Sequence, residues 1–186
     1  DVVSKADNAS ATLENQLEKM LAKAMPTDRM VLFAITIDDD LEILKRLNSM
    51  DLQLIQELLN SRYTTGLRSG DVVERYDPLS WMIALAPGTN LDLEAAIQQA
   101  SRLQTIVDEP LFVGDERLYF SSCIGFTLIQ HPFEPPERLM QQARDALKDA
   151  VNNGPDAIRA FTPAKSANKR GLSATTTGAL DGDLET

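Results

Sequence analysis

The chain has 186 residues with a formal net charge of -10; hydrophobic residues make up 43% and charged residues 25%. This composition is that of one soluble globular domain with a short appendage. Because phosphate-binding surfaces need clustered Lys and Arg, the acidic balance excludes a general nucleic-acid or anionic-membrane surface, but it leaves room for a local basic pocket that takes one small phosphate ligand.

Single cysteine and histidine residues leave little room for metal or thiol chemistry, and we expect no metal and no cofactor. Cys123 excludes an internal disulfide framework, and its apolar neighbours favour a small core residue. His131 precedes a proline in a predicted loop, and we assign it no chemistry. No stretch reaches the roughly 18 apolar residues of a membrane span, the N-terminus shows no signal-peptide pattern, and the chain starts on Asp. We therefore expect a cytoplasmic fragment of a longer protein.

The first half of the chain alternates helical and extended patterns. Residues 11–24 are predicted to form an amphipathic helix, because apolar residues recur at three- and four-residue steps. The nearly continuous apolar run of residues 30–37 predicts a strand, and a second helix is predicted over residues 41–60. Residues 70–76 and 81–85 then predict two strands of a β-hairpin around a turn-forming Asp-Pro step.

The second half repeats this alternation. A third helix is predicted over residues 92–107, and strands are predicted at 111–113 and at 118–128, the latter broken at Gly125. A fourth helix over residues 136–151 and a strand over 157–161 follow. This order predicts an α+β fold with a ferredoxin-like βαββαβ core and one mainly antiparallel sheet.

From Pro163 onward the apolar periodicity stops, and residues 173–179 are small and polar. We interpret residues 1–162 as the domain and residues 163–186 as a linker or tail.

The most informative motifs lie between residues 68 and 85. Arg68-Ser69-Gly70-Asp71 is followed by a strand ending in Arg75-Tyr76, and Asp77-Pro78-Leu79-Ser80-Trp81 then occupies the predicted hairpin tip. In order and spacing this resembles the GGDEF domains of diguanylate cyclases, which carry Arg-x-x-Asp, then Arg-Tyr, then Gly-Gly-Asp/Glu-Glu-Phe. Cys123-Ile124-Gly125 and Ala143-Arg144-Asp145-Ala146-Leu147 also resemble family segments. The resemblance covers roughly residues 1–162.

Departures from the family pattern bear on catalysis. The resemblance implies Mg²⁺ held by an acid at the third tip position and by an Asp on the first strand; here these positions are Leu79 and Ala34, with Thr36 two residues further on. Asp77-Pro78 replaces two glycines, and proline has no N–H to donate. Val151 and Pro155 stand where the family has a phosphate-binding Lys and Arg. We therefore expect a degenerate GGDEF domain without cyclase activity.

The Arg68-x-x-Asp71 pair is retained. In the family this pair is an inhibitory site for cyclic di-GMP, usually completed by an Arg of the following helix, for which Arg102 is the candidate. Arg offers a planar fork to phosphate or guanine, and Asp accepts from guanine N–H groups. The alternative is that both residues are solvated charges, with Asp71 fixing a turn. Tyr76 and Trp81 are interpreted as packing residues.

Two functions remain open at this point. The first is a regulatory module that binds cyclic di-GMP, or GTP without turnover, and modulates an adjacent EAL-type phosphodiesterase domain. The second is a ligand-free scaffold for homodimerisation or protein interaction. Neither function involves nucleic acid or membrane contact by this domain.

Overall fold

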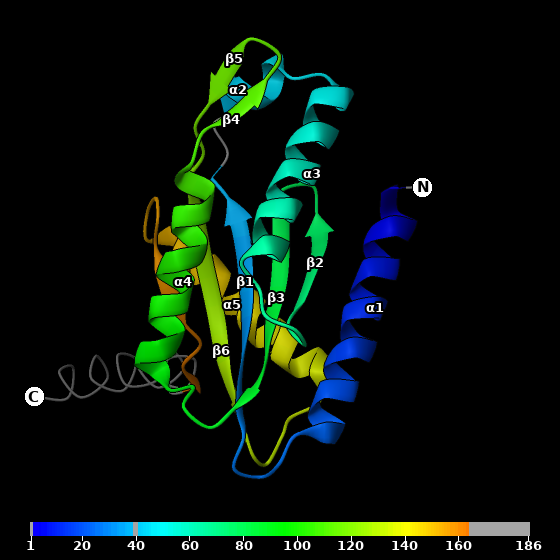
Figure 1. The fold of residues 1–186 in the computed structure, drawn as a ribbon, viewed down its shortest axis with the longest axis vertical. Coiled ribbons are helices and arrows are strands. Elements are labelled where there is room, and N and C mark those ends of the chain that lie inside the picture. Colours follow the sequence, from blue (N-terminus) through cyan, green and yellow to red (C-terminus); the bar gives the residue numbers. More distant parts are fainter. Residues whose placement is uncertain (1, 39–40, 164–186) are drawn as a thin grey trace, which may run out of the picture.

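The structure is a computed structural model that describes residues 2–38 and 41–163, and within them the side chains of 11–38 and 44–163 (Figure 1). Asp1 and almost all of the predicted tail lie outside the described residues. The helices are α1 (Val2–Lys23), α2 (Leu41–Arg46), α3 (Ser49–Thr65), α4 (Leu93–Asp108) and α5 (Pro136–Asn152). The strands are β1 (Arg29–Ile37), β2 (Val72–Asp77), β3 (Ser80–Gly88), β4 (Leu111–Val113), β5 (Glu116–Leu118), β6 (Ser122–Gln130) and β7 (Ile158–Ala160).

One five-stranded sheet organises the domain, in the order β2-β3-β1-β6-β7. All neighbouring strands in it are antiparallel except β6 and β7, which are parallel. Strands β4 and β5 form a separate small hairpin. The α+β prediction with a mainly antiparallel sheet is confirmed.

Strand β1 is the middle strand of the sheet, and helices cover both faces of it. Helices α3 and α4 lie on one face, and α1 and α5 lie on the other (Figure 1). Phe33 and Ile35 belong to the core on the α3/α4 side, whereas Leu32 and Ala34 belong to the core on the α1/α5 side, and all four are fully buried. A strand buried on both faces needs apolar residues at successive positions, which explains the continuous apolar run.

The helix predicted over residues 41–60 is wrong as a single element, because it is divided into α2 and α3. Asn48 between them has extended backbone geometry, and its side chain Oδ1 accepts a hydrogen bond from the Asp51 backbone N–H at 2.8 Å. Asn is a favoured N-cap because it satisfies a backbone donor that the first turn leaves unpaired. The apolar periodicity continues through this segment, so the sequence pattern did not indicate that a new helix starts after Asn48.

A single arginine joins α3 to the end of α4. The Arg62 guanidinium donates to the carbonyl oxygens of Ile106 at 3.3 Å, Glu109 at 2.6 Å and Pro110 at 2.8 Å. Carbonyl groups at a helix C-terminus lack intrahelical partners and carry partial negative charge. Arg62 therefore fixes the spacing of these two helices.

The strand break predicted at Gly125 is also wrong, because the break falls between β5 and β6 and Gly125 lies in the middle of β6. A Cβ at Gly125 would lie 2.0 Å from the backbone nitrogen of Leu147 in α5. Glycine is therefore required there by the close approach of α5 to the sheet, rather than by a turn.

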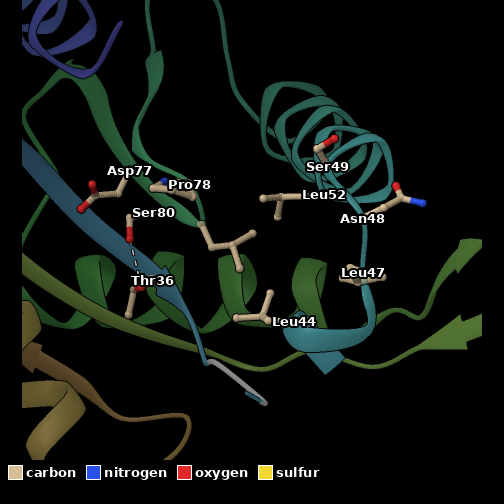
Figure 2. A pocket seen from close by; sticks show the side chains of 10 residues that line it. Thr36, Leu44, Leu47, Asn48, Ser49, Leu52, Asp77, Pro78 and Ser80 are labelled. Carbon is tan, nitrogen blue, oxygen red and sulfur yellow. Dashed lines mark hydrogen bonds between the residues drawn. The ribbon is translucent and has the colours of Figure 1, made fainter. Parts of the chain in front are cut away.

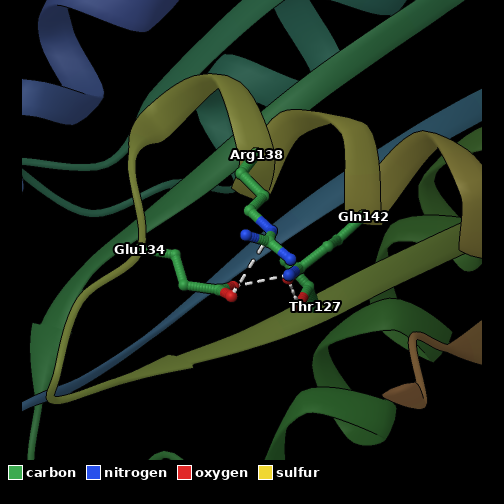
Figure 3. A network of polar contacts seen from close by, with 4 residues as sticks. All are labelled: Thr127, Glu134, Arg138 and Gln142. Carbon is green, nitrogen blue, oxygen red and sulfur yellow. Dashed lines mark hydrogen bonds and ion pairs between the residues drawn. The ribbon is translucent and has the colours of Figure 1, made fainter. Parts of the chain in front are cut away.

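A polar network fastens the loop before α5 to the sheet (Figure 3). Thr127 of β6 donates to the Gln142 side chain at 2.9 Å, and Gln142 donates to Glu134 at 2.5 Å. Glu134 also pairs with Arg138 at 3.6 Å. Four side chains from three consecutive segments thus fix where α5 begins.

In the described ranges, no helix combines the length and apolar character that crossing a bilayer requires.

Candidate functional site

The loop between α3 and β2 is held by the carboxylate of Asp71. One oxygen, Oδ2, accepts from the Arg68 backbone N–H at 2.8 Å, and Oδ1 accepts from the Ala86 backbone N–H at 2.7 Å. The Asp71 N–H donates to the Arg68 carbonyl at 3.1 Å, and Gly70 has a φ of 93°, which favours glycine. Asp71 therefore fixes the turn and the start of the hairpin, which is the structural role left open above.

The three residues of the predicted ligand site line one cavity, called here the Arg68 cavity. Its volume is about 840 Å³, within the range of small-molecule sites. Arg68 and Asp71 reach it from the loop before β2, and Arg102 reaches it from α4. Residues far apart in the sequence thus meet because α3 and α4 pack on one face of the sheet that contains the β2–β3 hairpin.

The Arg68 cavity is lined by more cationic than anionic side chains, whereas the whole chain carries a net negative charge. Arg68 and Arg102 are exposed, and neither guanidinium has a hydrogen-bond or ion-pair partner among the described residues. The single carboxylate lining the cavity, Asp71, is occupied by two backbone amides. Two unpaired guanidinium groups therefore make this cavity locally cationic in an acidic protein.

Sequence reasoning missed several polar residues that line the Arg68 cavity. Gln99 and Thr105 precede and follow Arg102 by three positions, so they share its face of α4. Ser69 and Asn90 line the cavity from loops. The three-residue spacing on α4 was visible in the sequence, but nothing there indicated which helical face meets the cavity.

At the other end of the hairpin, the tip is a tight turn tied to its surroundings. Asp77 and Ser80 pair across it, and Pro78 and Leu79 form the turn. The Gln56 side chain of α3 donates to the Pro78 carbonyl at 2.9 Å, and the Ile37 backbone N–H donates to the Leu79 carbonyl at 2.9 Å. The tip is thus held by α3 and by the end of β1.

A second cavity of about 520 Å³ lies beside this turn and is called here the tip cavity (Figure 2). Its apolar lining comes from Leu44, Leu47, Leu52, Pro78 and Leu79. Its polar lining comes from Thr36, Asn48, Ser49, Asp77 and Ser80. The Ser80 hydroxyl donates to the Thr36 hydroxyl at 3.0 Å, as Figure 2 shows.

Of the two strand positions considered, Thr36 rather than Ala34 faces the tip. Thr36 pairs with Ser80 across β1 and β3, whereas Ala34 pairs with Met82 two residues further from the tip. The tip therefore presents two hydroxyl groups and the buried Leu79 where the resemblance places carboxylates. Within the described part of the chain, no three His, Cys, Asp or Glu side chains gather so that they could hold a metal ion. This donor set does not fit Mg²⁺.

The packing interpretations of Trp81 and Cys123 are confirmed. Trp81 is fully buried, donates from Nε1 to the Asn60 side chain at 3.2 Å and lies 5.6 Å from the Tyr63 ring centroid. Cys123 is 1% exposed and donates to Asp38 at 3.2 Å, and burial raises the pKa of its thiol to about 11. Burial likewise raises the pKa of the Tyr76 hydroxyl to about 12. The Cys123 thiol and the Tyr76 hydroxyl therefore stay protonated near neutral pH.

Comparison with known proteins places this fold in a family. The family profile described as "Diguanylate cyclase, GGDEF domain" matches residues 1–157. No curated protein matches the chain. Solved structures do match, and the GGDEF domain of YfiN (TpbB) from Pseudomonas aeruginosa has a TM-score of 0.71 at 21% identity, covering 86% of this chain and 93% of that one.

Two further structures show the same fold. An EAL/GGDEF domain protein from M. capsulatus has a TM-score of 0.67 at 22% identity, covering 79% of this chain and 94% of that one. The GGDEF domain of DgcB from Caulobacter crescentus, in complex with c-di-GMP, has a TM-score of 0.67 at 13% identity, covering 81% and 86% of the two chains. The chain belongs to the GGDEF family, the diguanylate cyclase domains of cyclic di-GMP signalling.

Proposed function

We propose that this chain is a catalytically inactive GGDEF module that binds cyclic di-GMP in the Arg68 cavity. The observation that carries the proposal is the pair of unpartnered guanidinium groups, Arg68 and Arg102, at one cavity of an acidic protein. Each guanidinium offers a planar set of donors to phosphate oxygens or to a guanine edge. The DgcB domain, which has the same fold, was solved with c-di-GMP bound.

Loss of cyclase activity is supported by the tip. Phosphoryl transfer from GTP needs metal ions to neutralise charge that develops on the phosphates. Thr36, Leu79 and Ser80 offer no carboxylate for such an ion. Val151 and Pro155, at the positions where the resemblance places phosphate-binding cations, are uncharged as well.

We further propose that the module acts on a neighbouring EAL-type phosphodiesterase domain. A solved protein of the same fold, from M. capsulatus, is an EAL/GGDEF domain protein. Ligand binding to this module would change the neighbour only through a difference in affinity between two arrangements of the pair. Phosphodiesterase activity of the full-length protein, measured with and without the Arg68→Ala change, tests this step.

The alternative is a ligand-free interaction scaffold. Leu93 and Ile97 lie one turn apart on α4 and are 49% and 42% exposed. Exposed apolar residues on one helical face are suited to packing against a second copy or a partner. Sedimentation at increasing protein concentration, with Ile97→Gln as the variant, tests this alternative.

Isothermal titration with cyclic di-GMP is the direct test, with GTP–Mg²⁺ titrated in parallel. We expect micromolar or tighter binding of cyclic di-GMP and at least tenfold weaker binding in Arg68→Ala and in Arg102→Ala. Arg29→Ala is the matched control, because Arg29 is an exposed arginine outside the cavity. At 100 times the dissociation constant the ligand should add about 2.7 kcal/mol to the free energy of unfolding.

The outcomes separate the proposals. Binding that is retained in both cavity variants would locate the ligand elsewhere and refute the proposed site. Absence of binding by either nucleotide would leave the scaffold alternative. Turnover of GTP by the wild-type chain would refute catalytic inactivity.

A further inference from the structure

We propose that the tip cavity is a second ligand site, which takes an uncharged small molecule with an apolar body and one hydrogen-bonding group. The inference is independent of nucleotide binding in the Arg68 cavity. It rests on the charges, the apolar walls and the hydroxyl pair of the tip cavity.

The charge of the lining excludes anionic ligands. Among the residues that the structure describes, Asp77 is the only ionisable one that lines the tip cavity, and no Lys or Arg does. A phosphate or carboxylate group would meet the Asp77 carboxylate, which is exposed and has no ion-pair partner among the described residues, and like charges repel. The Arg68 cavity, with two free guanidinium groups, has the opposite preference.

Three segments supply the apolar walls. Leu44 lies in α2, Leu52 lies in α3, and Leu79 lies in the hairpin turn; Figure 2 shows Leu44 and Leu52 with Leu47 around the same space. Leu79 is buried, while the other three leucines are half-buried and keep part of their surface at the cavity. Covering that surface with an apolar ligand is favourable because it removes apolar area from water. A volume of about 520 Å³ fits a small molecule.

The hydroxyl pair supplies polar anchors. Ser80 donates to Thr36 at 3.0 Å, so the Thr36 hydroxyl keeps one lone pair that can accept from a ligand N–H, and also its own proton for a ligand acceptor. Asn48 also lines the cavity, but its side-chain oxygen is used as the cap of α3. The Thr36 hydroxyl can therefore orient a neutral polar group without requiring a charge.

The cavity is also preformed. The turn is anchored at the Pro78 carbonyl by Gln56 and at the Leu79 carbonyl by Ile37, each at 2.9 Å. A ligand therefore does not have to order the turn before it binds, which lowers the entropic cost of association.

The test uses two probes that differ in charge. Indole is a neutral apolar ring with one N–H donor, and indole-3-acetate adds a carboxylate to the same ring. The ¹⁵N-labelled chain is titrated with each probe at millimolar concentrations, and amide shifts are followed by NMR. We expect saturable shifts for indole over residues 44–52 and 77–80, and at least tenfold weaker binding of indole-3-acetate.

Two variants place the site. Leu52→Gln and Leu47→Gln each put an amide into the apolar wall and should weaken indole binding at least fivefold. The matched control Leu93→Gln changes an exposed leucine outside the cavity and should have no effect. Unchanged amide dispersion in the sheet verifies that each variant is folded. Equal binding of both probes, unchanged binding in both wall variants, or absence of saturable shifts at the tip would overturn the proposal.

Discussion

Replacing Gly125 with alanine tests how closely α5 must approach the sheet. The added Cβ would lie 2.0 Å from the Leu147 nitrogen, 2.4 Å from the Ala146 carbonyl carbon and 2.5 Å from the Leu147 Cα. All three are backbone atoms, so no side-chain rotation relieves the clash. Ordinary van der Waals contact begins near 3.4 Å, and α5 would have to move away by more than an ångström.

The cost of this movement follows from what α5 buries. Its buried residues are Leu139, Met140, Ala143, Ala146, Leu147 and Ala150. Interiors are close-packed, so a shift of this size opens gaps along the whole contact. Overpacking that side chains can relieve costs about 1–3 kcal/mol. Because this clash involves backbone, we expect a loss of about 4 kcal/mol in the free energy of unfolding and a fall of roughly 10 °C in Tm.

Urea titration followed by Trp81 fluorescence measures the effect. Trp81 is the only tryptophan and is fully buried, so its emission reports on the core. Gly88→Ala is the matched control, because a Cβ there meets nothing within 4 Å, and it should change stability by less than about 0.5 kcal/mol. If Gly125→Ala and Gly88→Ala unfold at the same urea concentration, the argument from close approach is refuted.

Three other positions give sharp expectations. Asp71→Ala leaves two backbone amides without their acceptor and should lower the free energy of unfolding by about 1–3 kcal/mol in urea; an unchanged midpoint would contradict its turn role. Arg62→Lys replaces a fork bonded to three carbonyls by a point charge, and should cost about 2 kcal/mol in the same assay. Because burial raises the Cys123 pKa to about 11 from 9.0, its thiol should react with Ellman's reagent roughly 100-fold slower than an ordinary thiol at about pH 8. The contribution of Cys123 to the free energy of unfolding should fall as the pH rises from the lower to the higher of these two pKa values, because in this range the thiol loses its proton in the unfolded chain but keeps it in the folded one.

The sheet could be predicted because its strands carry local signals. The run at residues 30–37 is apolar at successive positions because helices cover both faces of β1, and the Asp-Pro step marks the hairpin turn. Asn48 was missed because its capping role depends on backbone geometry that the apolar stripe around it does not reveal. Gly125 was misread because a glycine required by a neighbouring helix looks, in sequence, like a glycine that breaks a strand.

The two cavities differ in how far sequence could lead to them. The spacing of Arg68 and Asp71 identified one wall of the Arg68 cavity, and the family resemblance added Arg102. Without that resemblance Arg102 would not have been chosen, because which face of α4 lines the cavity depends on how the helix packs and not on a local sequence pattern. At the tip, the sequence did not show which of Ala34 and Thr36 faces the turn, and the pairing of β1 with β3 shows that Thr36 does.

If the tip is inactive, as proposed, the burial of Leu79 predicts that side-chain replacement alone does not give it cyclase activity. Leu79 is 8% exposed and belongs to the core cluster beneath α3 and α4. A carboxylate there would lose hydration, and its pKa would rise until it bound a proton in place of a metal ion. We therefore expect the double variant Thr36→Asp/Leu79→Asp to lose about 3 kcal/mol in urea unfolding and to form no cyclic di-GMP from GTP–Mg²⁺. Leu93→Asp, the same change at an exposed leucine, should keep wild-type stability, and measurable turnover by the double variant would show that the tip lacks only its ligands.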